Sequence, residues 1–458
     1  MLSLKRKYSR LIAVLFLSGS IVTLLLHIPA SSDISMMSVR IRNSEVDDIE
    51  TLHPILPKPP QPRQGFQRSI PQDKQEINIE STQRNAKQQA SSHVQISSQT
   101  SHSYRALPRI TGWMETNKIH DDYNFCPRIE PFLGPFNFDS RTKNPCWNDT
   151  GVFRCLPYFY IAGFSKCGTS DLFFKLVQHP EVAKSGVKEK HWFDYFRFVA
   201  DTRFIQNYTD KFINGTSHIE SEVHQTGYSN KITVDGTPCY VWGSLNWPCY
   251  EGNQGLSEPL FTNADVIYRM NPKARIIISM REPVKRLYSR MLTWIAEPLH
   301  PAYVNSTPEK FHTFIVERIQ MYRQCFSQWT HRQCAYNGTL YQEAVLRLAE
   351  GAYSIYVKDW LQVFPREQLL FIKFEDYVHD LNATLRRVHR FLELSPLTET
   401  EMQKILNSGT ANAGKHYNIG PMENKTKTIL QEFYQPFNEE LAQILNDPHM
   451  TWTYGEGI

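Results

Sequence analysis

The sequence predicts an α/β domain in which a central, mainly parallel sheet is flanked by helices. After residue 120, short apolar, β-branched stretches alternate with segments of helical periodicity, and this alternation is typical of strand–helix units with parallel strands. Residues 274–280 (ARIIISM) are apolar enough for a central strand. An apolar run at 158–162 leads into a polar loop and then a helical pattern. The 458 residues are enough for one large domain with additional segments.

The remaining elements are expected in order along this domain. Further strands are expected at 231–236 and 369–374, and helices at 283–292, 311–322, 341–364, 375–392 and 425–445. Pro283 suits the first turn of its helix, where no backbone N–H is needed. Residues 409–421, which contain Gly and Asn, are expected to form a loop before the last helix.

Composition and charge are those of a globular protein without a strong overall field. The charged fraction is 21% and the hydrophobic fraction 41%. The net charge of +4 is accounted for by Lys5, Arg6, Lys7 and Arg10, so the rest of the chain is near neutral. No global basic surface argues for nucleic acid, and a polyanion would have to be held by a local patch.

The N-terminus has the pattern of a membrane signal anchor. Residues 11–28 form an almost uncharged run of 18 that follows the basic residues, which predicts a cytosolic tail at 1–10 and a membrane-spanning helix at 11–28. A signal peptide cleaved near Ala30 is the competing interpretation. Residues 29–120 are rich in Pro, Gln and Ser and predict a flexible luminal stem, which leaves 121–458 as the folded domain.

Cysteines and glycosylation sequons are confined to the region after the stem. An oxidising lumen favours disulfides among the eight cysteines, with Cys325–Cys334 as the best pair and Cys239–Cys249 as a weaker one. Metal binding is less expected, because Cys-x-x-Cys and paired histidine spacings are absent from the sequence. The seven Asn-x-Ser/Thr sequons support passage through the secretory pathway. They are Asn148, Asn207, Asn214, Asn305, Asn337, Asn382 and Asn424.

The loop at 163–170 (GFSKCGTS) has the pattern of an anion-binding turn between a strand and a helix. Backbone N–H groups at the start of such a helix point at one spot, where the helix dipole favours negative charge. The loop nearly matches the Walker A pattern, but Thr169 stands where that pattern has lysine, and Lys166 comes three positions earlier. This spacing disfavours an ATP-dependent kinase. An ordinary strand-to-helix turn remains an alternative.

A second candidate phosphate site follows the strand at 274–280. Arg281 lies at its end, and Ser289 lies about two helical turns further on, so the two side chains can converge on one phosphate. Arg286 and Arg290 are alternatives on neighbouring faces of the same helix. Taken singly, Arg281 could equally be a surface or salt-bridged residue.

Together these two motifs resemble the cofactor signatures of the luminal carbohydrate sulfotransferases, which use 3′-phosphoadenosine 5′-phosphosulfate (PAPS). The resemblance runs from about Pro157 to the C-terminus. When residues 188–194 (KEKHWFD) are included, the resemblance is greatest to the branch that sulfates O-6 of N-acetylgalactosamine 4-sulfate. Many relatives have proline in place of Ser165 and threonine in place of Cys167. It implies a single P-loop-like sulfotransferase domain. The 3′-phosphate site would be Arg281 and Ser289, and the 5′-phosphosulfate loop would be Ser165, Lys166, Cys167, Gly168, Thr169 and Ser170.

The resemblance also implies roles in the reaction. Glu189 would be the base that takes the acceptor proton, with His191 as the other candidate, and Lys166 would stabilise the departing bisphosphate. The lysines beside Glu189 would lower its pKa. Lys415, in a segment near the end of the chain, would also contact the donor. No metal is required in this scheme, because lysine and the helix dipole supply the positive charge.

Cys167 is expected to be a reduced packing residue. That leaves an odd seven cysteines, so at least one more should be unpaired.

The expected acceptor is a sulfated glycosaminoglycan, with Lys188, Lys190 and Arg197 as candidate ligands. A solvated charge run is the alternative interpretation of 188–194. The expected location is the Golgi membrane, as a single-pass type II protein with a luminal catalytic domain. Heparan sulfate or another chondroitin position is the alternative acceptor, and a non-catalytic glycan-binding protein is the alternative class.

Overall fold

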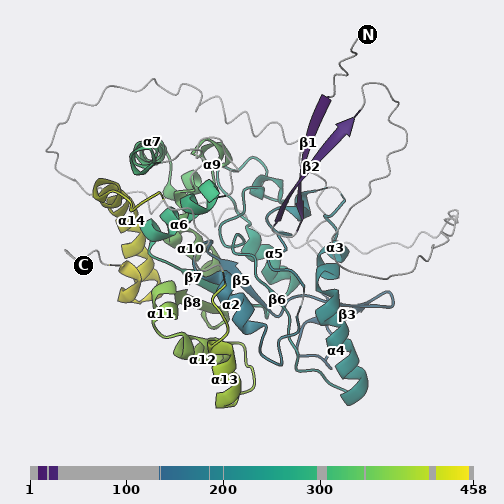
Figure 1. Cartoon of the computed structure of the whole chain (residues 1–458). Coiled ribbons are helices and arrows are strands. Elements are labelled where there is room, and N and C mark those ends of the chain that lie inside the picture. The colour runs from purple at the N-terminus through teal and green to yellow at the C-terminus, as the bar shows by residue number, and fades with distance from the viewer. Residues whose placement is uncertain are drawn as a thin grey trace, which may run out of the picture. The chain divides into compact units, whose positions relative to one another are not determined.

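The computed structural model describes residues 9–17, 20–28, 134, 136–184, 186–199, 201–296, 307–344, 347–411 and 419–452. The chain divides into two units, Met1–Ile110 and Thr111–Ile458, which are described separately (Figure 1).

The described part of the first unit is a pair of antiparallel strands, β1 (Ser9–Leu17) and β2 (Ser20–Ile28), paired from Ser9 opposite Ile28 to Leu17 opposite Ser20. The structure thus differs from the helix expected at 11–28. A continuous apolar run does not distinguish helix from strand by period, and its β-branched residues also favour strands. Among the described residues no helix combines the length and the apolar character needed to cross a membrane. The stem lies outside the described residues.

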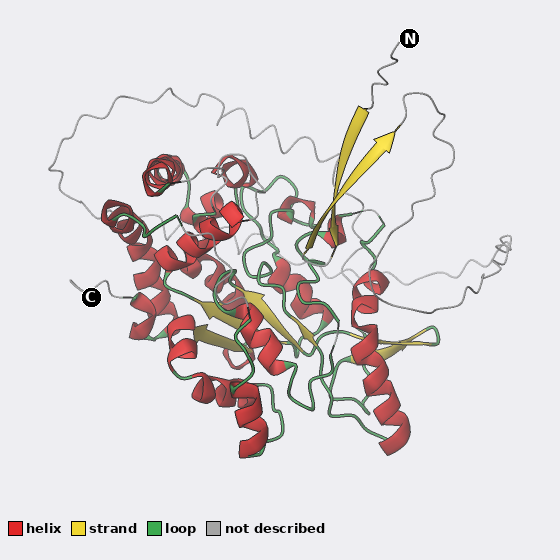
Figure 2. Ribbon diagram, in the orientation of Figure 1, coloured by secondary structure: helices red, strands yellow, loops and turns green. Residues whose placement is uncertain are grey.

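The second unit is built on a four-stranded parallel sheet, which confirms the expected α/β class (Figure 2). Its order is β6-β5-β7-β8. The strands are β5 (Phe159–Gly163), β6 (Val234–Asp235), β7 (Arg275–Met280) and β8 (Leu369–Lys373). The first strand of this sheet along the chain, β5, therefore lies between two later ones, β6 and β7.

Alternate residues of the strands enter two different cores, one on each face of the sheet. Tyr160 and Ala162 of β5 belong to the larger core, and Phe159 and Ile161 to the smaller. This follows from the period of two in a strand, which turns successive side chains to opposite faces. Helices α5, α6, α7, α10 and α14 contribute to the larger core, and α2, α12 and α13 to the smaller. Both faces are covered, which accounts for the largely apolar composition of β5, β7 and β8.

The helices follow the expected order with two breaks. They are α2 (Thr169–Leu176), α3 (Ile205–Thr209), α4 (Ile213–Thr226), α5 (Asn263–Met270), α6 (Pro283–Ala296), α7 (Pro308–Phe326), α8 (His331–Ala335), α9 (Gly338–Ala344), α10 (Tyr353–Val363), α11 (Phe374–His379), α12 (Leu381–Phe391), α13 (Glu399–Leu406) and α14 (Asn424–Leu445). The helix expected at 341–364 is replaced by α9 and α10. The one expected at 375–392 is divided at Asp380, whose side chain accepts a hydrogen bond from the backbone N–H of Ala383 (2.9 Å) and so caps α12.

The cysteines correct one expectation and confirm two. Cys325 and Cys334 form a disulfide, as predicted. A second disulfide, Cys146–Cys155, joins the strands of the hairpin β3 (Cys146–Asp149) and β4 (Val152–Cys155). The pairing of Cys239 with Cys249 was wrong, because Cys239 is a free thiol and Cys249 is disulfide-bonded elsewhere. Cys167 is also free and buried, so the expected second unpaired cysteine is Cys239.

Candidate functional site

The anion-binding loop lies between β5 and α2, and its backbone shape depends on Gly168. Gly168 precedes the first residue of α2 with φ 76°, and no side chain among the described residues caps this helix start. A Cβ at Gly168 would lie 2.7 Å from the ring of Phe374, so a side chain is excluded by packing as well as by backbone conformation. Lys166 has φ 70°. The helix N–H groups therefore remain available to an anion.

The end of β7 braces this loop from the neighbouring strand. Ser279 Oγ donates to the carbonyl of Cys167 (2.7 Å), and Arg281 donates to the carbonyl of Lys166 (3.4 Å). The Arg281 guanidinium lies 4.8 Å from the centre of the Phe374 ring, and Tyr353 donates to the Arg281 carbonyl (2.7 Å). The structure thus brings the predicted strand-end arginine beside the predicted loop.

Lys166 reaches from the loop to α6, the helix that carries Ser289. Its Nζ donates to Thr293 Oγ1 (2.7 Å), and Thr293 Oγ1 donates to the carbonyl of Ser289 (2.9 Å). Lys166 is thus connected to α6 through Thr293 and to the end of β7 through Arg281. Lys415 lies outside the described residues.

Glu189, His191 and Asp194 form a chain of ionisable groups on the loop that precedes α3. Lys188 pairs with Glu189, His191 Nε2 lies 3.6 Å from Glu189 Oε2, and His191 Nδ1 lies 2.8 Å from Asp194 Oδ2. Glu189 and His191 have positive φ values of 63° and 50°, which cost conformational energy in non-glycine residues. The surrounding structure must hold this loop in place.

The charges along this chain set the protonation of its two candidate bases. Burial opposes ionisation of Glu189, but the hydrogen bond from His191 and the charge of Lys188 prevail and lower its pKa to about 2. Burial also opposes protonation of His191, but its contacts with Asp194 and Glu189 raise its pKa to about 10. At neutral pH Glu189 is thus ionised and 43% exposed, whereas His191 is an imidazolium. This state favours Glu189 over His191 as the proton acceptor.

A buried hydrogen-bond network holds this loop against the sheet. Thr237 Oγ1 accepts from the backbone N–H groups of Lys190 (2.9 Å) and His191 (3.4 Å), and donates to Asp235 Oδ1 (2.6 Å). Asp235 Oδ2 also accepts from the hydroxyls of Tyr208 (2.8 Å) and Tyr240 (2.9 Å). Sequence reasoning missed these residues. The signal in the sequence was the Asp-Gly-Thr-Pro segment at 235–238, where an expected strand ends.

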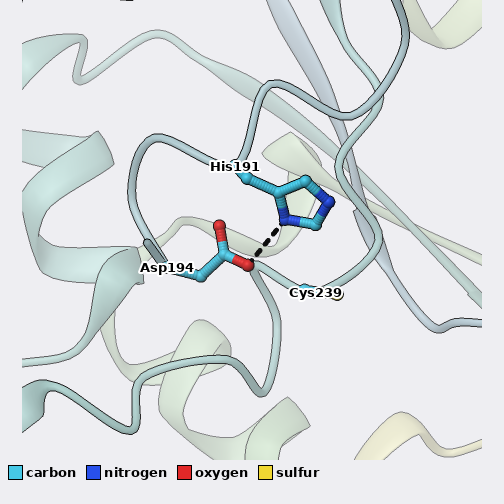
Figure 3. Close-up of side chains that lie close together, drawn as sticks. All are labelled: His191, Asp194 and Cys239. Atoms are coloured by element: carbon cyan, nitrogen blue, oxygen red, sulfur yellow. Dashed lines mark hydrogen bonds and ion pairs between the residues drawn. The ribbon is translucent and has the colours of Figure 1, made fainter. Parts of the chain in front are cut away.

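Cys239 links the two loops. Its Sγ lies 3.9 Å from Ser165 Oγ in the anion-binding loop. On its other side it lies next to His191 and Asp194, and one polar or sulfur atom from each of the three is within 4.8 Å of the others (Figure 3). The anion-binding loop and the Glu189 loop are therefore neighbours in the fold.

Two of the three cations expected to hold the acceptor are packed into the protein. Lys190 is 5% exposed, with its Nζ donating to the carbonyl of Val187 (2.6 Å), and Arg197 is 3% exposed. The Arg197 guanidinium lies over the rings of Trp192 (5.5 Å) and Tyr250 (5.2 Å). Burial among aromatic rings does not suit contact with a polysaccharide. Lys190 and Arg197 are therefore structural residues, a correction to the expectation, and Lys188 is committed to Glu189.

Six of the seven sequon asparagines lie in the described residues, and none of these six is buried. Asn148, Asn214 and Asn424 are exposed, and Asn207, Asn337 and Asn382 are half-buried. Asn305 lies outside the described residues.

The chain is similar to several known proteins. The sulfotransferase domain family matches residues 156–442. Human carbohydrate sulfotransferase 15 is 35% identical over 315 residues, which are 65% of this chain and 55% of that protein. Mouse heparan sulfate glucosamine 3-O-sulfotransferase 3B1 is 24% identical over 63% of each chain. A solved sulfotransferase structure from Alicyclobacillus acidocaldarius is 22% identical with a TM-score of 0.40, and covers 64% of this chain and 96% of that one. The chain thus spans about half the length of human carbohydrate sulfotransferase 15.

Proposed function

Because the chain belongs to the sulfotransferase domain family, we propose that it transfers a sulfuryl group from PAPS to a hydroxyl of a glycosaminoglycan. The observation that carries the proposal is the position of Cys239, which places the loop of Lys166 next to the loop of Glu189. This neighbourhood supports a site that would combine an anion-binding helix start with an ionised general base.

The residues of this site fit a donor with two phosphate groups. The uncapped N–H groups at the start of α2 would hold the 5′-phosphate, together with the Thr169 and Ser170 hydroxyls. Arg281 and Ser289 would hold the 3′-phosphate, and Lys415 is proposed as a further donor contact.

The chemistry follows from charge placement rather than from covalent catalysis. PAPS supplies an activated sulfuryl group when bound. Glu189, ionised and partly exposed, would accept the proton of the acceptor hydroxyl. Lys166, which donates to Thr293 in this structure, would stabilise the negative charge on the departing bisphosphate. His191, an imidazolium held by Asp194, orients Glu189.

The proposed acceptor hydroxyl is O-6 of N-acetylgalactosamine 4-sulfate in chondroitin or dermatan sulfate. The motif resemblance of residues 165–170 and 188–194 and the 35% identity to human carbohydrate sulfotransferase 15 support it. Heparan sulfate or another chondroitin position is the second candidate, supported by the more distant heparan sulfate relatives.

The test is incubation of the full chain with labelled PAPS and a panel of glycosaminoglycans, followed by disaccharide analysis of the product. Label at O-6 of the 4-sulfated residue is expected, and Lys166→Ala and Glu189→Gln should each abolish transfer. Full activity in either variant would remove that residue from its role. Binding of the bisphosphate product without transfer to any acceptor would favour the non-catalytic class.

We also propose that the chain is a Golgi membrane protein with its folded unit in the lumen. The basic residues before the apolar run at 11–28 and the six sequon asparagines outside the core support this orientation. Alkaline carbonate extraction of cell membranes with glycosidase mapping tests it. Release of the chain into the supernatant, or absence of glycans, would contradict it.

A further inference from the structure

Three side chains from two separate segments form a compact cluster of nitrogen, oxygen and sulfur donors beside Glu189. His191 and Asp194 come from the loop before α3, and Cys239 follows β6. Figure 3 shows the imidazole and the carboxylate turned toward each other, with Cys239 next to the carboxylate. We propose that His191, Asp194 and Cys239 bind a Zn²⁺ ion, and that zinc held there inhibits the enzyme. The inhibitory half rests on the proposed sulfotransferase function.

The donor set and its spacing suit zinc. Zinc takes cysteine, histidine and carboxylate ligands at about 2.0–2.3 Å in a tetrahedron, which places the donor atoms roughly 3.3–3.8 Å apart. His191 Nδ1 and Asp194 Oδ2 lie 2.8 Å apart, and one donor atom from each of the three residues lies within 4.8 Å of the other two. Side-chain movements of about 1 Å or less would bring these separations to those of a tetrahedron. Calcium and magnesium prefer sites built from several oxygens, and one carboxylate with a thiol is a poor match for either ion.

The donors are available to an ion. Cys239 is a free thiol. Asp194 Oδ1 is buried and has no hydrogen-bond partner among the described residues, and a buried carboxylate oxygen left unpaired is costly. The His191 side chain is 32% exposed, so an ion can reach the cluster from solvent. Ligation replaces the Cys239 thiol proton and the proton on His191 Nδ1, and both pass to water.

An ion at this position would interfere with both halves of the proposed reaction. It would attract the Glu189 carboxylate, which lies 3.6 Å from His191 Nε2, and so weaken it as a base. It would also draw Cys239 away from Ser165, the first residue of the donor loop. Neither effect requires the fold to change, since the donors already lie close together.

Binding can be tested without any activity measurement. The full chain is stripped of metal with a chelator and dialysed, then titrated with Zn²⁺ by calorimetry and with Co²⁺ as a spectroscopic probe. We expect one equivalent per chain and a cobalt–thiolate charge-transfer band. Cys239→Ser should lack the cobalt–thiolate band and should bind Zn²⁺ at least tenfold more weakly. Cys167→Ser, which removes the other free thiol of the described residues, should retain both the band and the affinity.

Asp194→Asn provides a second variant in case Cys239→Ser folds poorly, and should also weaken binding at least tenfold. Circular dichroism checks the fold of each variant. The site is overturned if the wild-type chain binds no ion, if Cys239→Ser binds as tightly as wild type, or if Cys167→Ser abolishes the cobalt band.

The inhibitory half is tested by measuring sulfuryl transfer against Zn²⁺ concentration. Inhibition in the wild type should follow the calorimetric binding curve, and in Cys239→Ser it should shift to at least tenfold higher zinc. If zinc binds without changing the rate of sulfuryl transfer, the proposed inhibition is overturned and the proposed zinc site stands. Zinc binding in a chain that transfers no sulfate in metal-free buffer would instead overturn the proposed function.

Discussion

His191 Nδ1 lies 2.8 Å from Asp194 Oδ2, a contact that contributes to holding the imidazole protonated beside Glu189. Because the folded pKa of His191, about 10, is above its ordinary 6.5, this contact stabilises the fold fully below pH 6.5 and is lost as the pH rises toward 10. The lowered pKa of Glu189 acts in the opposite sense. Its contribution is present above pH 4.5 and is lost as the pH falls toward 2.

Asp194→Asn should therefore flatten the alkaline decline in stability. The variant loses the charge that raises the pKa of His191, so less stabilisation remains to be lost between about pH 7 and pH 10. Urea unfolding at several pH values measures this. Asp139→Asn, which loosens the ion pair with the exposed Arg141, should keep the wild-type slope above neutrality. Identical alkaline slopes for Asp194→Asn and wild type would contradict the assignment.

Thr237→Val should slow sulfuryl transfer about tenfold while the donor KM changes little. The substitution keeps the side-chain shape but leaves two backbone N–H groups of the Glu189 loop and Asp235 without the hydroxyl, a loss of roughly 1–3 kcal/mol. Steady-state kinetics with kcat and KM separated is the measurement. Thr226→Val removes an exposed hydroxyl near the end of α4 and should behave as wild type. An equal fall in both variants would show that the loss is not specific to this network.

Gly168→Ala should abolish donor binding and destabilise the protein. The new Cβ would lie 2.7 Å from Phe374 in a residue with φ 76°, and the backbone penalty alone is about 1–2 kcal/mol. Calorimetry with the bisphosphate product and thermal unfolding measure the two effects. Gly227→Ala is a matched control, because its φ is 84° and nothing lies within 4 Å of the added Cβ. Gly227→Ala should be destabilised by the backbone penalty alone and should bind the bisphosphate product as wild type does.

Glu350→Gln should be the most destabilising of these changes. Glu350 and Arg286 form an ion pair with 1% and 0% of their side chains exposed and 3.1 Å between Oε2 and NH1. Removing one partner leaves a buried charge uncompensated, which costs about 3–5 kcal/mol. Urea unfolding is compared with Glu399→Gln, which removes a surface ion pair with Arg386 and should change the free energy of unfolding little, because solvent screens exposed pairs. Similar losses in the two variants would refute the prediction.

The strand–loop–helix unit of the site could be predicted because its signals are local. The apolar run before Gly163, the polar loop and the helical period after Thr169 all lie within a few residues of one another, and β5 and α2 form where they were expected. Arg281 could be placed for the same reason, since it directly follows a strongly apolar strand. Parallel strands share one carboxyl edge, which brings their following residues together.

The supporting residues could not be predicted, because tertiary packing brings them to the site. Thr237 and Cys239 lie more than forty positions after Glu189 in the sequence, and no local period marks them. The burial of Arg197 had a weak signal in the aromatic residues around it, such as Trp192 and Phe196. Cys146–Cys155 also had a signal, since its spacing of nine equals that of Cys325–Cys334.

The central position of β5 bears on how the chain can fold during synthesis. Its neighbour β7 ends at Met280, and the ring that closes over Gly168 belongs to Phe374. The carboxylate of Asp171, in the first turn of α2, accepts hydrogen bonds from the Tyr377 hydroxyl and from the backbone N–H of Ala411. The loop at 163–170 is among the first parts of the domain to leave the ribosome, yet the contacts of the helix that follows it are complete only about 240 residues later. Nascent chains shorter than that should expose an unfinished loop to chaperones.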